Sequence, residues 1–435
     1  MRSSFSNPAP KCSASPSDDP IKAAAPTLSA LVIVGAGLAG GNAARTLREQ
    51  DYDGEIVLIG DEPGVPFGRP PLSKTYLRGE ETLDGWLVEP ADWYAAHAVD
   101  LQRGTVARID AGAHRVSMRS GDEIEYSRLL IATGGRNRTF DVPGADLGGI
   151  HQLRTVADAD AIKRAARAGA HAVVVGMGFI GCEVTASLRQ LGVDVTSVFP
   201  GEAPLASVLG PQMGSVMAGV HAENRVQLLA HDQVVRFEGR GRVVRAVTKA
   251  GRSLACDFAV VAVGIQPNVE FLQDSGVAVD NGVLVDSMCR TNLPDVYAAG
   301  DVASHLHPLF GRTRVEHYNN AEKQGRSVAG TMLGSNQPYD YLHTFWSDQY
   351  DHKLEYAGEA RRWDAFVVRG SLEARKALGF YLVDGVVRAV VGLNRGGDPE
   401  IDTQGEMAAA AQLIRRRSRV SVRDLADEGQ DLGRL

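Results

Sequence analysis

The sequence has 435 residues, of which 44% are apolar and 23% are charged, and its formal net charge is -7. This length suits about three domains with separate cores, and the acidic balance argues against general binding to nucleic acid or to an anionic membrane. No apolar run approaches the roughly 20 residues that span a bilayer, and the four cysteines are scattered without a CxxC pair. We therefore expect a soluble cytoplasmic protein with no disulfide framework and no bound metal.

The first 29 residues differ from the rest of the chain in composition. They are rich in Ser, Ala and Pro, and they contain no apolar stretch of signal-peptide length. Such a segment buries too little apolar surface to fold alone, so we expect a disordered leader. A targeting segment is the alternative interpretation.

The stretch from residue 31 to residue 47, LVIVGAGLAGGNAARTL, has the pattern of a buried strand, a tight turn and a helix. Gly35 permits the turn, Gly37 leaves room for a pyrophosphate against the backbone, and Gly40 allows the helix to pack closely on the strand. The N–H groups at the start of the helix then face the phosphates. This pattern predicts a dinucleotide-binding βαβ unit, and a glycine turn in an ordinary α/β domain is the alternative.

A second strand, predicted at residues 55–59, completes this unit and ends beside Asp61. A carboxylate at the end of this strand is placed to bind the hydroxyl groups of a ribose. The loop that follows, PFGRPPLSK at residues 66–74, carries Arg69 and Lys74 on a segment stiffened by prolines. Two cations held there can neutralise phosphate or face a reactive ring, and solvated loop charges are the alternative.

Two strand-like stretches come next, at residues 106–116 and 123–132. The second is apolar and runs into the sequence ATGG. We therefore predict a buried strand whose loop returns close to a bound cofactor, and a plain turn after the strand is the alternative.

The glycine motif recurs in the middle of the chain. Residues 172–183, AVVVGMGFIGCE, again combine a short apolar strand with GxGxxG spacing, here at Gly176, Gly178 and Gly181. A helix and a strand at residues 193–199 are predicted to follow. Two such units in one chain indicate two dinucleotides, one a flavin and the other a nicotinamide, which together form a hydride relay.

The end of the second unit bears on the choice between NADH and NADPH. Its second strand ends at Phe199, with no acid directly at the tip, and Glu202 follows. A carboxylate that reaches the adenosine ribose repels a 2′-phosphate, so Glu202 indicates NADH. Glu183, which we expect in the first turn of the helix, either faces the nicotinamide or complements the helix dipole.

The last part of the chain adds a third region. A β-rich stretch spans residues 226–263, and DVYAAGDVAS at residues 295–304 predicts a strand and a glycine turn before Asp301, which can bond the ribityl chain of a flavin. Strand-like segments then precede a helix predicted at residues 404–417, which ends in the basic run Arg415 to Arg417. A solvated helix end is the first interpretation of this run, and contact with an acidic iron–sulfur protein is the alternative.

The motifs GAGLAG, ATGG, GMGFIG and AAGD stand in this order along the chain, with RPPLSK after the first of them and FWSDQY at residues 345–350. With this set, the sequence from about residue 30 to about residue 415 resembles the FAD-dependent NADH:ferredoxin reductases of bacterial oxygenase and P450 systems. The segments VFPGE, VEHYNNA and FWSD are also similar to apoptosis-inducing factor, and an acid usual in the family is replaced by Phe199.

The resemblance implies an α/β fold with two Rossmann-like dinucleotide-binding domains, as in glutathione reductase, and a small α+β interface domain at the C-terminus. The implied FAD-binding domain is discontinuous, over residues 30–148 and 270–340. Residues 149–269 would form the NADH-binding domain, and residues 341–435 the interface domain.

The resemblance also implies which residues surround the cofactors. The FAD site would comprise Gly35, Ala36, Gly37, Leu38, Ala39, Gly40, Asp61, Arg69, Lys74, Val106, Thr133, Gly134, Arg136, Asp301 and Val302. The NADH site would comprise Gly176, Gly178, Ile180, Gly181, Glu183, Glu202 and Gly264, with His317 beside both cofactors. The candidate catalytic residues are Lys74, Glu183, Glu316 and Trp346.

The implied activity is hydride transfer from NADH to FAD, followed by transfer of single electrons to a small acidic [2Fe-2S] ferredoxin that feeds an oxygenase or a P450. The lack of a CxxC pair in the sequence argues against reductases in which electrons leave through a dithiol. The alternatives are an NADH oxidase or quinone reductase, an NADH-responsive flavoprotein similar to apoptosis-inducing factor, and a flavin-free α/β scaffold. We expect a monomer or a homodimer.

Overall fold

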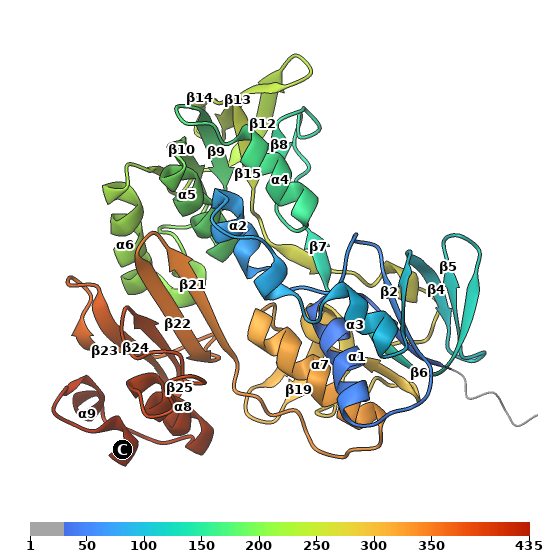
Figure 1. Ribbon diagram of the computed structural model, residues 1–435. Coiled ribbons are helices and arrows are strands. Elements are labelled where there is room, and N and C mark those ends of the chain that lie inside the picture. The colour runs from blue at the N-terminus through green and yellow to red at the C-terminus, as the bar shows by residue number, and fades with distance from the viewer. Residues whose placement is uncertain (1–29) are drawn as a thin grey trace, which may run out of the picture.

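The computed structural model describes residues 30–435, so the expected leader at residues 1–29 lies outside the described residues. Figure 1 shows three lobes: the blue N-terminal segment shares one lobe with the light orange segment, the green segment forms a second, and the red C-terminal segment forms a third. Within residues 30–435, no helix has both the length and the apolar character that a bilayer crossing requires.

The first lobe is built on a seven-stranded sheet whose strands follow the order β3 (Val99–Arg103), β2 (Ile56–Gly60), β1 (Ala30–Val34), β6 (Glu123–Ile131), β5 (Arg115–Met118) and β4 (Val106–Asp110), with β18 (Val296–Ala298) beside β6. The pairs among β1, β2, β3, β6 and β18 are parallel, and those among β4, β5 and β6 are antiparallel. β1 is buried along its whole length, which explains its unbroken apolar sequence.

Helices and a small sheet complete the first lobe. The α-helices are α1 (Leu38–Glu49), α2 (Thr75–Arg78), α3 (Ala91–Ala96) and α7 (Tyr318–Met332). The small sheet holds β17 (Val283–Val285), β19 (Ala303–His307) and β20 (Gly311–Thr313), and single 3-10 turns lie at Pro70–Ser73, Asp84–Trp86, Glu270–Leu272 and Gly300–Val302.

The second lobe repeats the parallel βαβ arrangement. Its sheet has the order β11 (Gln227–Leu229), β10 (Asp194–Val198), β9 (His171–Val175), β15 (Phe258–Val261) and β8 (Ile150–His151). Three helices accompany it, α4 (Val156–Ala165), α5 (Phe179–Gln190) and α6 (Ala206–Glu223), with an antiparallel sheet of β12 (Val234–Gly239), β13 (Val243–Thr248) and β14 (Ser253–Ala255). The chain enters and leaves this lobe through the antiparallel pair β7 (Gly135–Asn137) and β16 (Ile265–Pro267).

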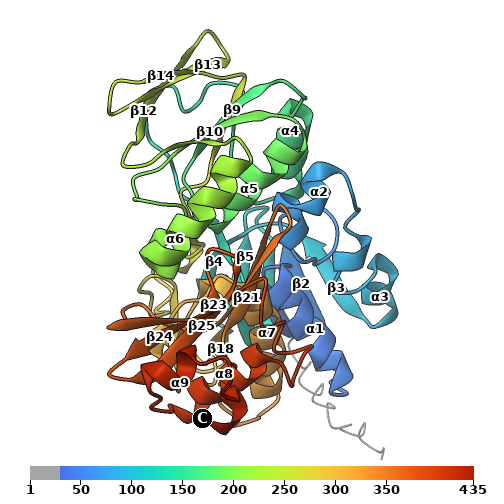
Figure 2. The same cartoon turned by 90° about the vertical axis from the view of Figure 1, so that its left-hand side faces the viewer.

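The third lobe is an antiparallel sheet with two helices. Its strands follow the order β21 (Thr344–Gln349), β22 (His352–Gly358), β25 (Val386–Leu393), β24 (Lys376–Val383) and β23 (Ala365–Ser371). The helices are α8 (Glu406–Arg416) and α9 (Val422–Ala426), and a 3-10 turn at Leu432–Arg434 follows. Figures 1 and 2 show the hairpin of β21 and β22 rising from this lobe toward α5, with which β21 is in contact.

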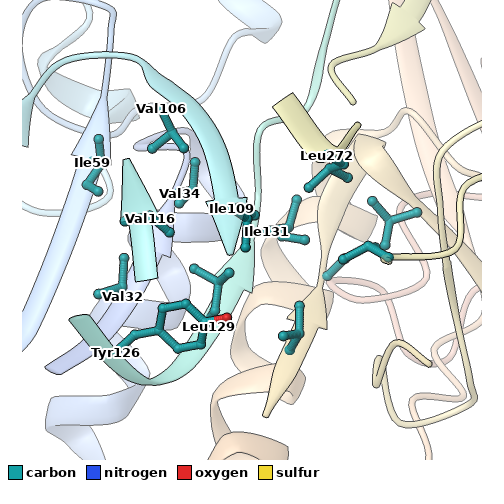
Figure 3. Packing of buried hydrophobic residues seen from close by; sticks show 14 of the residues in the cluster. Val32, Val34, Ile59, Val106, Ile109, Val116, Tyr126, Leu129, Ile131 and Leu272 are labelled. Atoms are coloured by element: carbon teal, nitrogen blue, oxygen red, sulfur yellow. The ribbon is translucent and has the colours of Figure 1, made fainter. Parts of the chain in front are cut away.

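Apolar clusters lie within the first lobe, between the first and second lobes, and between the second and third lobes. In Figure 3, the side chains of the first core gather from β1, β2, β4, β5 and β6 and reach Leu272. A different cluster combines Phe199 and Met217 of the second lobe with Tyr356 and Tyr381 of the third. The two parallel βαβ units and the antiparallel sheet with its helices confirm the predicted fold class.

Candidate functional site

The first glycine turn is closed by backbone on one side and open on the other. Gly35 has a φ of +118°, and a Cβ at this residue would lie 2.2 Å from the carbonyl oxygen of Ala132 at the end of β6. A Cβ on Gly40 would lie 2.0 Å from the carbonyl oxygen of Gly35. At Gly37, by contrast, a Cβ would have no atom within 4 Å. The open space lies at the start of α1, where a phosphate binds to helix N–H groups.

The second glycine turn repeats this geometry. Gly176 has a φ of +98°, and its Cβ would lie 2.3 Å from the carbonyl oxygen of Ala262, while a Cβ on Gly181 would lie 2.1 Å from the carbonyl oxygen of Gly176. Gly178, like Gly37, has open space beside it. Each turn is a cradle that a side chain would fill, so the residues present fit the pyrophosphates of two dinucleotides.

The residues near the second cradle differ in exposure. Ile180, at the start of α5, is 45% exposed, and Gly264 has a φ of +95° in the loop after β15. Phe199 is buried and packs in the cluster shared by the second and third lobes, whereas Glu202 is exposed. The ribose contact of Glu202 therefore stays a prediction, as does that of Asp61, which is exposed directly after β2.

A buried ion pair joins the first lobe to the second. The Lys74 ammonium lies 2.7 Å from Oε2 of Glu183, and the Ser73 hydroxyl donates to the same oxygen at 2.5 Å. The Ser347 hydroxyl, from β21 of the third lobe, donates to Oε1 at 2.7 Å. Glu183 is 3% exposed and Lys74 is 8% exposed. All three lobes thus meet at one carboxylate.

The position of Glu183 in its helix differs from the prediction. Because α5 begins at Phe179, Glu183 lies in the second turn and not in the first. A carboxylate that is buried and paired with an ammonium is not simply a partner of the helix dipole, whose effect is confined to the first turn. The ion pair with Lys74 accounts for its burial instead.

A second carboxylate lies near this pair. Burial raises the pKa of Asp348 above its ordinary value, the ammonium of Lys74 opposes this rise, and the carboxylate of Glu183 adds to it. The Lys74 ammonium therefore interacts with two carboxyl groups, those of Glu183 and Asp348. Such a set of coupled charges is typical of a functional site.

Asp301 is held by two arginines that the sequence did not single out. Its Oδ2 atom accepts a hydrogen bond from Arg154 at 2.9 Å, and its carbonyl oxygen accepts one from Arg314 at 3.0 Å. Arg314 also forms a 2.7 Å ion pair with Glu316. Desolvation raises the pKa of Glu316, while Arg314 lowers it.

Arg69 has protein partners for its guanidinium. It forms a 2.6 Å ion pair with Glu62 and donates at 2.6 Å to the carbonyl oxygen of Arg154. Its predicted approach to the flavin stays a prediction. The bond to Arg154 links it to the Asp301 group.

Aromatic side chains surround the start of α7. His317, which caps this helix, stacks on Phe345 with a centroid distance of 4.2 Å, and burial lowers the pKa of His317 to about 4. Trp346 contacts Tyr318 edge to face at 5.7 Å, and Tyr318 contacts Trp86 in the same way at 5.9 Å. His317 is therefore neutral at pH 7, and the next residue, Tyr318, joins Trp346 and Trp86 in a row of edge-to-face contacts.

Other predicted residues lie in the connection between lobes or in the core. Thr133 Oγ1 donates to the carbonyl oxygen of Asn268 at 2.8 Å, and Arg136 forms a 2.5 Å ion pair with Glu270. Gly134, with a φ of +59°, lies between them. The side chains of Val106 and Val302 pack in the core of the first lobe.

The described thiols do not form a redox pair. Cys182, Cys256 and Cys289 are free and buried, and burial raises the pKa of Cys256 to about 11 and that of Cys289 to about 12. Desolvation also raises the pKa of Cys182. Each is therefore a neutral thiol at pH 7.

Comparisons with known proteins agree with this geometry. A family model described as pyridine nucleotide-disulphide oxidoreductase matches residues 29–325, and one described as reductase C-terminal matches residues 344–435. Rhodocoxin reductase of Rhodococcus erythropolis is 39% identical over 79% of this chain and 81% of that protein. The biphenyl dioxygenase system ferredoxin–NAD(+) reductase component of Paraburkholderia xenovorans is 36% identical over 93% of this chain and 98% of that protein.

Solved structures give the same result. The ferredoxin reductase for the CYP199A2 system of Rhodopseudomonas palustris has a TM-score of 0.88 and 33% identity, covering 93% of this chain and 99% of that one. The reductase in a covalent putidaredoxin reductase–putidaredoxin complex has a TM-score of 0.87 and 33% identity, covering 93% and 97%.

Proposed function

The chain belongs to the pyridine nucleotide-disulphide oxidoreductase family, and from this premise we propose that it is an FAD-dependent NADH:ferredoxin oxidoreductase. It transfers a hydride from NADH to FAD and then single electrons to a ferredoxin that feeds an oxygenase or a P450. Relatives that match more than 90% of the chain are ferredoxin reductase components of dioxygenase systems. The solved ferredoxin reductase of the CYP199A2 system supports a P450 as the alternative to an oxygenase as final electron acceptor.

The Lys74–Glu183 pair is the observation that carries this proposal. Lys74 comes from the lobe with the first glycine cradle, and Glu183 comes from the helix that begins at the second cradle. A fixed pair of charges between two dinucleotide sites suits hydride transfer, because preorganised charges in a dry site need no reorganisation during the reaction.

The protein's part in the reaction is to bind and to orient. The chemistry that FAD supplies when bound is acceptance of a hydride and release of single electrons. Gly35 to Gly40 and Asp61 are assigned to FAD, and Gly176 to Gly181 to NADH. Lys74 also donates to the carbonyl oxygen of Pro70 at 3.3 Å, which fixes the direction of its ammonium.

The domain division belongs to the same proposal. We assign residues 30–148 and 270–340 to a discontinuous FAD-binding domain, residues 149–269 to an NADH-binding domain and residues 341–435 to an interface domain. Support comes from β18, which follows the second lobe in sequence but pairs with β6 in the first sheet.

The finer identity of the partner and the location are proposed as well. We propose a small acidic [2Fe-2S] ferredoxin, and the exposed run Arg415 to Arg417 at the end of α8 supports an acidic partner. A reducing cytoplasm is supported by the free thiols of the described cysteines.

An anaerobic titration with NADH, followed by stopped-flow absorbance, tests the proposed reaction. We expect a yellow protein whose flavin band bleaches fast and completely, and cytochrome c reduction that requires added ferredoxin. A colourless protein would overturn the proposal. So would ferredoxin-independent reduction with rapid oxygen consumption, which indicates an oxidase, or slow bleaching with a persistent charge-transfer band, which indicates an NADH-responsive protein.

The preference for NADH is tested by Glu202→Arg, with NADPH compared in the same titration. If Glu202 repels a 2′-phosphate, this variant shifts the preference toward NADPH. A variant that retains the selectivity of the parent would remove Glu202 from the cofactor site.

A further inference from the structure

Strand β21 carries two buried polar side chains, Ser347 and Gln349, to which the FWSDQY motif gave no role. Ser347 is 0% exposed and Gln349 is 1% exposed. Since they are two residues apart on a strand, both side chains point to the same face. This face meets α5, and Figure 2 shows the β21–β22 hairpin reaching out of the third lobe to that contact.

Hydrogen bonds connect these two side chains to Glu183 on one side and to α6 on the other. The Ser347 hydroxyl lies 2.7 Å from Oε1 of Glu183, and Nε2 of Gln349 lies 3.2 Å from the Ser347 hydroxyl. Oε1 of Gln349 lies 3.1 Å from Nε2 of His221, whose Nδ1 lies 3.2 Å from the Tyr350 hydroxyl.

The donor and acceptor of every hydrogen bond in this series follow from the Glu183 carboxylate at one end. A carboxylate only accepts, so Ser347 donates to Glu183 and accepts from the amide of Gln349. The amide oxygen also accepts, so Nε2 of His221 carries the proton and Nδ1 accepts from Tyr350. Burial lowers the pKa of His221 to about 4, which agrees with a neutral ring at pH 7. All four donors therefore point toward the carboxylate, and aligned bonds of this kind strengthen one another.

The two oxygens of Glu183 are thus held by different lobes. Ser73 and Lys74 of the first lobe bind Oε2, and Ser347 of the third lobe binds Oε1. Without the Ser347 hydroxyl, Oε1 would lose this charge-assisted bond in a buried place, where an unsatisfied acceptor is costly. The carboxylate could then rotate, and the Lys74 ammonium would follow it.

We propose that Ser347 and Gln349 are positioning residues that fix the Glu183 carboxylate, so that the third lobe sets the geometry of the Lys74–Glu183 pair. The kinetic consequence rests on the proposed function, whereas the hydrogen-bond chain does not. NADH binding is expected to persist without them, because the second cradle is made by other residues. The step that depends on the ion pair is expected to slow.

Ser347→Ala tests this proposal, with Ser197→Ala as the matched control. Ser197 is also 0% exposed, and its hydroxyl has one hydrogen-bond partner among the described residues, the hydroxyl of Thr185. We expect Ser347→Ala to lower the limiting rate of flavin reduction by NADH about ten-fold, as for loss of a bond to a charged group, with an unchanged Kd for NADH. Ser347→Thr, which keeps the hydroxyl, should restore the rate. Equal effects of Ser347→Ala and Ser197→Ala would overturn the proposal.

A double-mutant cycle shows whether Ser347 acts through Glu183. In a Glu183→Gln background, we expect Ser347→Ala to cause no ten-fold loss, because the carboxylate that it positions is gone. An undiminished loss in that background would overturn the proposal.

The ring nitrogens of His221 give a readout that needs no turnover. In protein labelled with ¹⁵N-histidine, we expect the Nε2–H tautomer for His221, and a shift of its ring signals in Gln349→Leu but not in Ser197→Ala. The Nδ1–H tautomer of His221 would contradict the proposed series of hydrogen bonds. If NADH fails to reduce the flavin but the His221 signals behave as expected, the proposed function fails and the hydrogen-bond chain stands.

Discussion

At the scale of single residues, the two glycine turns show that one residue type meets two different needs. A Cβ at Gly181 would collide with a backbone oxygen, whereas a Cβ at Gly178 would enter open space. The fold therefore requires a glycine at position 181, whereas at position 178 it is the ligand that requires one. A methyl group at Gly178 should therefore spare the protein and fill the place of a phosphate.

Gly178→Ala is expected to fold like the parent and to bind NAD⁺ about ten-fold more weakly, a loss of about 1.4 kcal/mol. Gly85→Ala is the matched control, because a Cβ at Gly85 also meets no atom within 4 Å. Thermal melting should place both variants close to the parent, and calorimetric titration with NAD⁺ should separate them. Equal NAD⁺ affinities would remove Gly178 from the pyrophosphate site.

The sequence predicted the glycine turns, Lys74 and Glu183, because each lies in a motif with a characteristic spacing. It did not predict Ser73, Ser347 or Arg154. Ser73 and Ser347 lie in the RPPLSK and FWSDQY segments, but no spacing in these segments singles out the serine, and Arg154 lies in no motif. Their partners come from other lobes, so their roles depend on tertiary packing that no local pattern encodes.

At the scale of elements, β19 and the segment before β21 bring three buried histidines together. The rings of His307 and His343 are 4.8 Å apart, those of His305 and His307 are 5.8 Å apart, and Phe310 lies 4.8 Å from His307. Burial lowers the pKa of His305 to about 4 and that of His343 to about 2, and it lowers the pKa of His307 as well. Neither ring nitrogen of His343 has a protein partner among the described residues.

These histidines predict a loss of stability in mild acid. In the unfolded chain their pKa is about 6.5, so between about pH 4 and 6.5 the unfolded state binds more protons than the folded one. The free energy of unfolding therefore falls as the pH is lowered through this window, by about 1.4 kcal/mol per pH unit for each neutral buried ring.

His343→Phe removes one of these rings, so the free energy of unfolding should fall less steeply with pH, by up to about 1.4 kcal/mol per pH unit. Urea unfolding at pH 7, 6 and 5 measures this slope. His97→Gln, at an exposed histidine, should keep the slope of the parent. An unchanged slope in His343→Phe would show that its ring is not held neutral in the folded state.

Strands were predicted well where the sequence is apolar, as for β2 (Ile56–Gly60), which lies within one residue of its predicted bounds, 55–59. The start of α5 was placed too late, because Glu183 was predicted in the first turn of this helix. In the structure Gly178 caps the helix, and Gly181 already lies inside it. Close packing of Gly181 on the strand, and not a turn, explains that glycine.

At the scale of the whole molecule, the second and third lobes are tied through one apolar cluster. Tyr381 of β24 is 0% exposed and donates to the carbonyl oxygen of Leu209 in α6 at 2.8 Å. Its ring also contacts Trp363 edge to face at 4.9 Å. Two lobes that share a core in this way are expected to unfold together.

Tyr381→Ala should lower the free energy of unfolding by about 3 to 5 kcal/mol, and near-ultraviolet circular dichroism and the loss of NAD⁺ binding, which reports on the second lobe, should shift together in urea. Tyr381→Phe, which keeps the ring and loses one hydrogen bond, should cost about 1 kcal/mol. Two separate transitions in Tyr381→Ala, with the loss of NAD⁺ binding unshifted, would show that the second and third lobes unfold independently.

The pairing of β18 with β6 also means that the first sheet cannot be completed until β18 has been translated. β6 ends at Ile131 and β18 begins at Val296, so translation at about 5–20 residues per second delivers the missing strand roughly 165 residues, or on the order of ten seconds, later. The second lobe is synthesised within that interval, while β6 of the first sheet still lacks its partner β18. We therefore expect chaperones to bind nascent chains most often after β6 and before β18 has been synthesised, while the first sheet is incomplete.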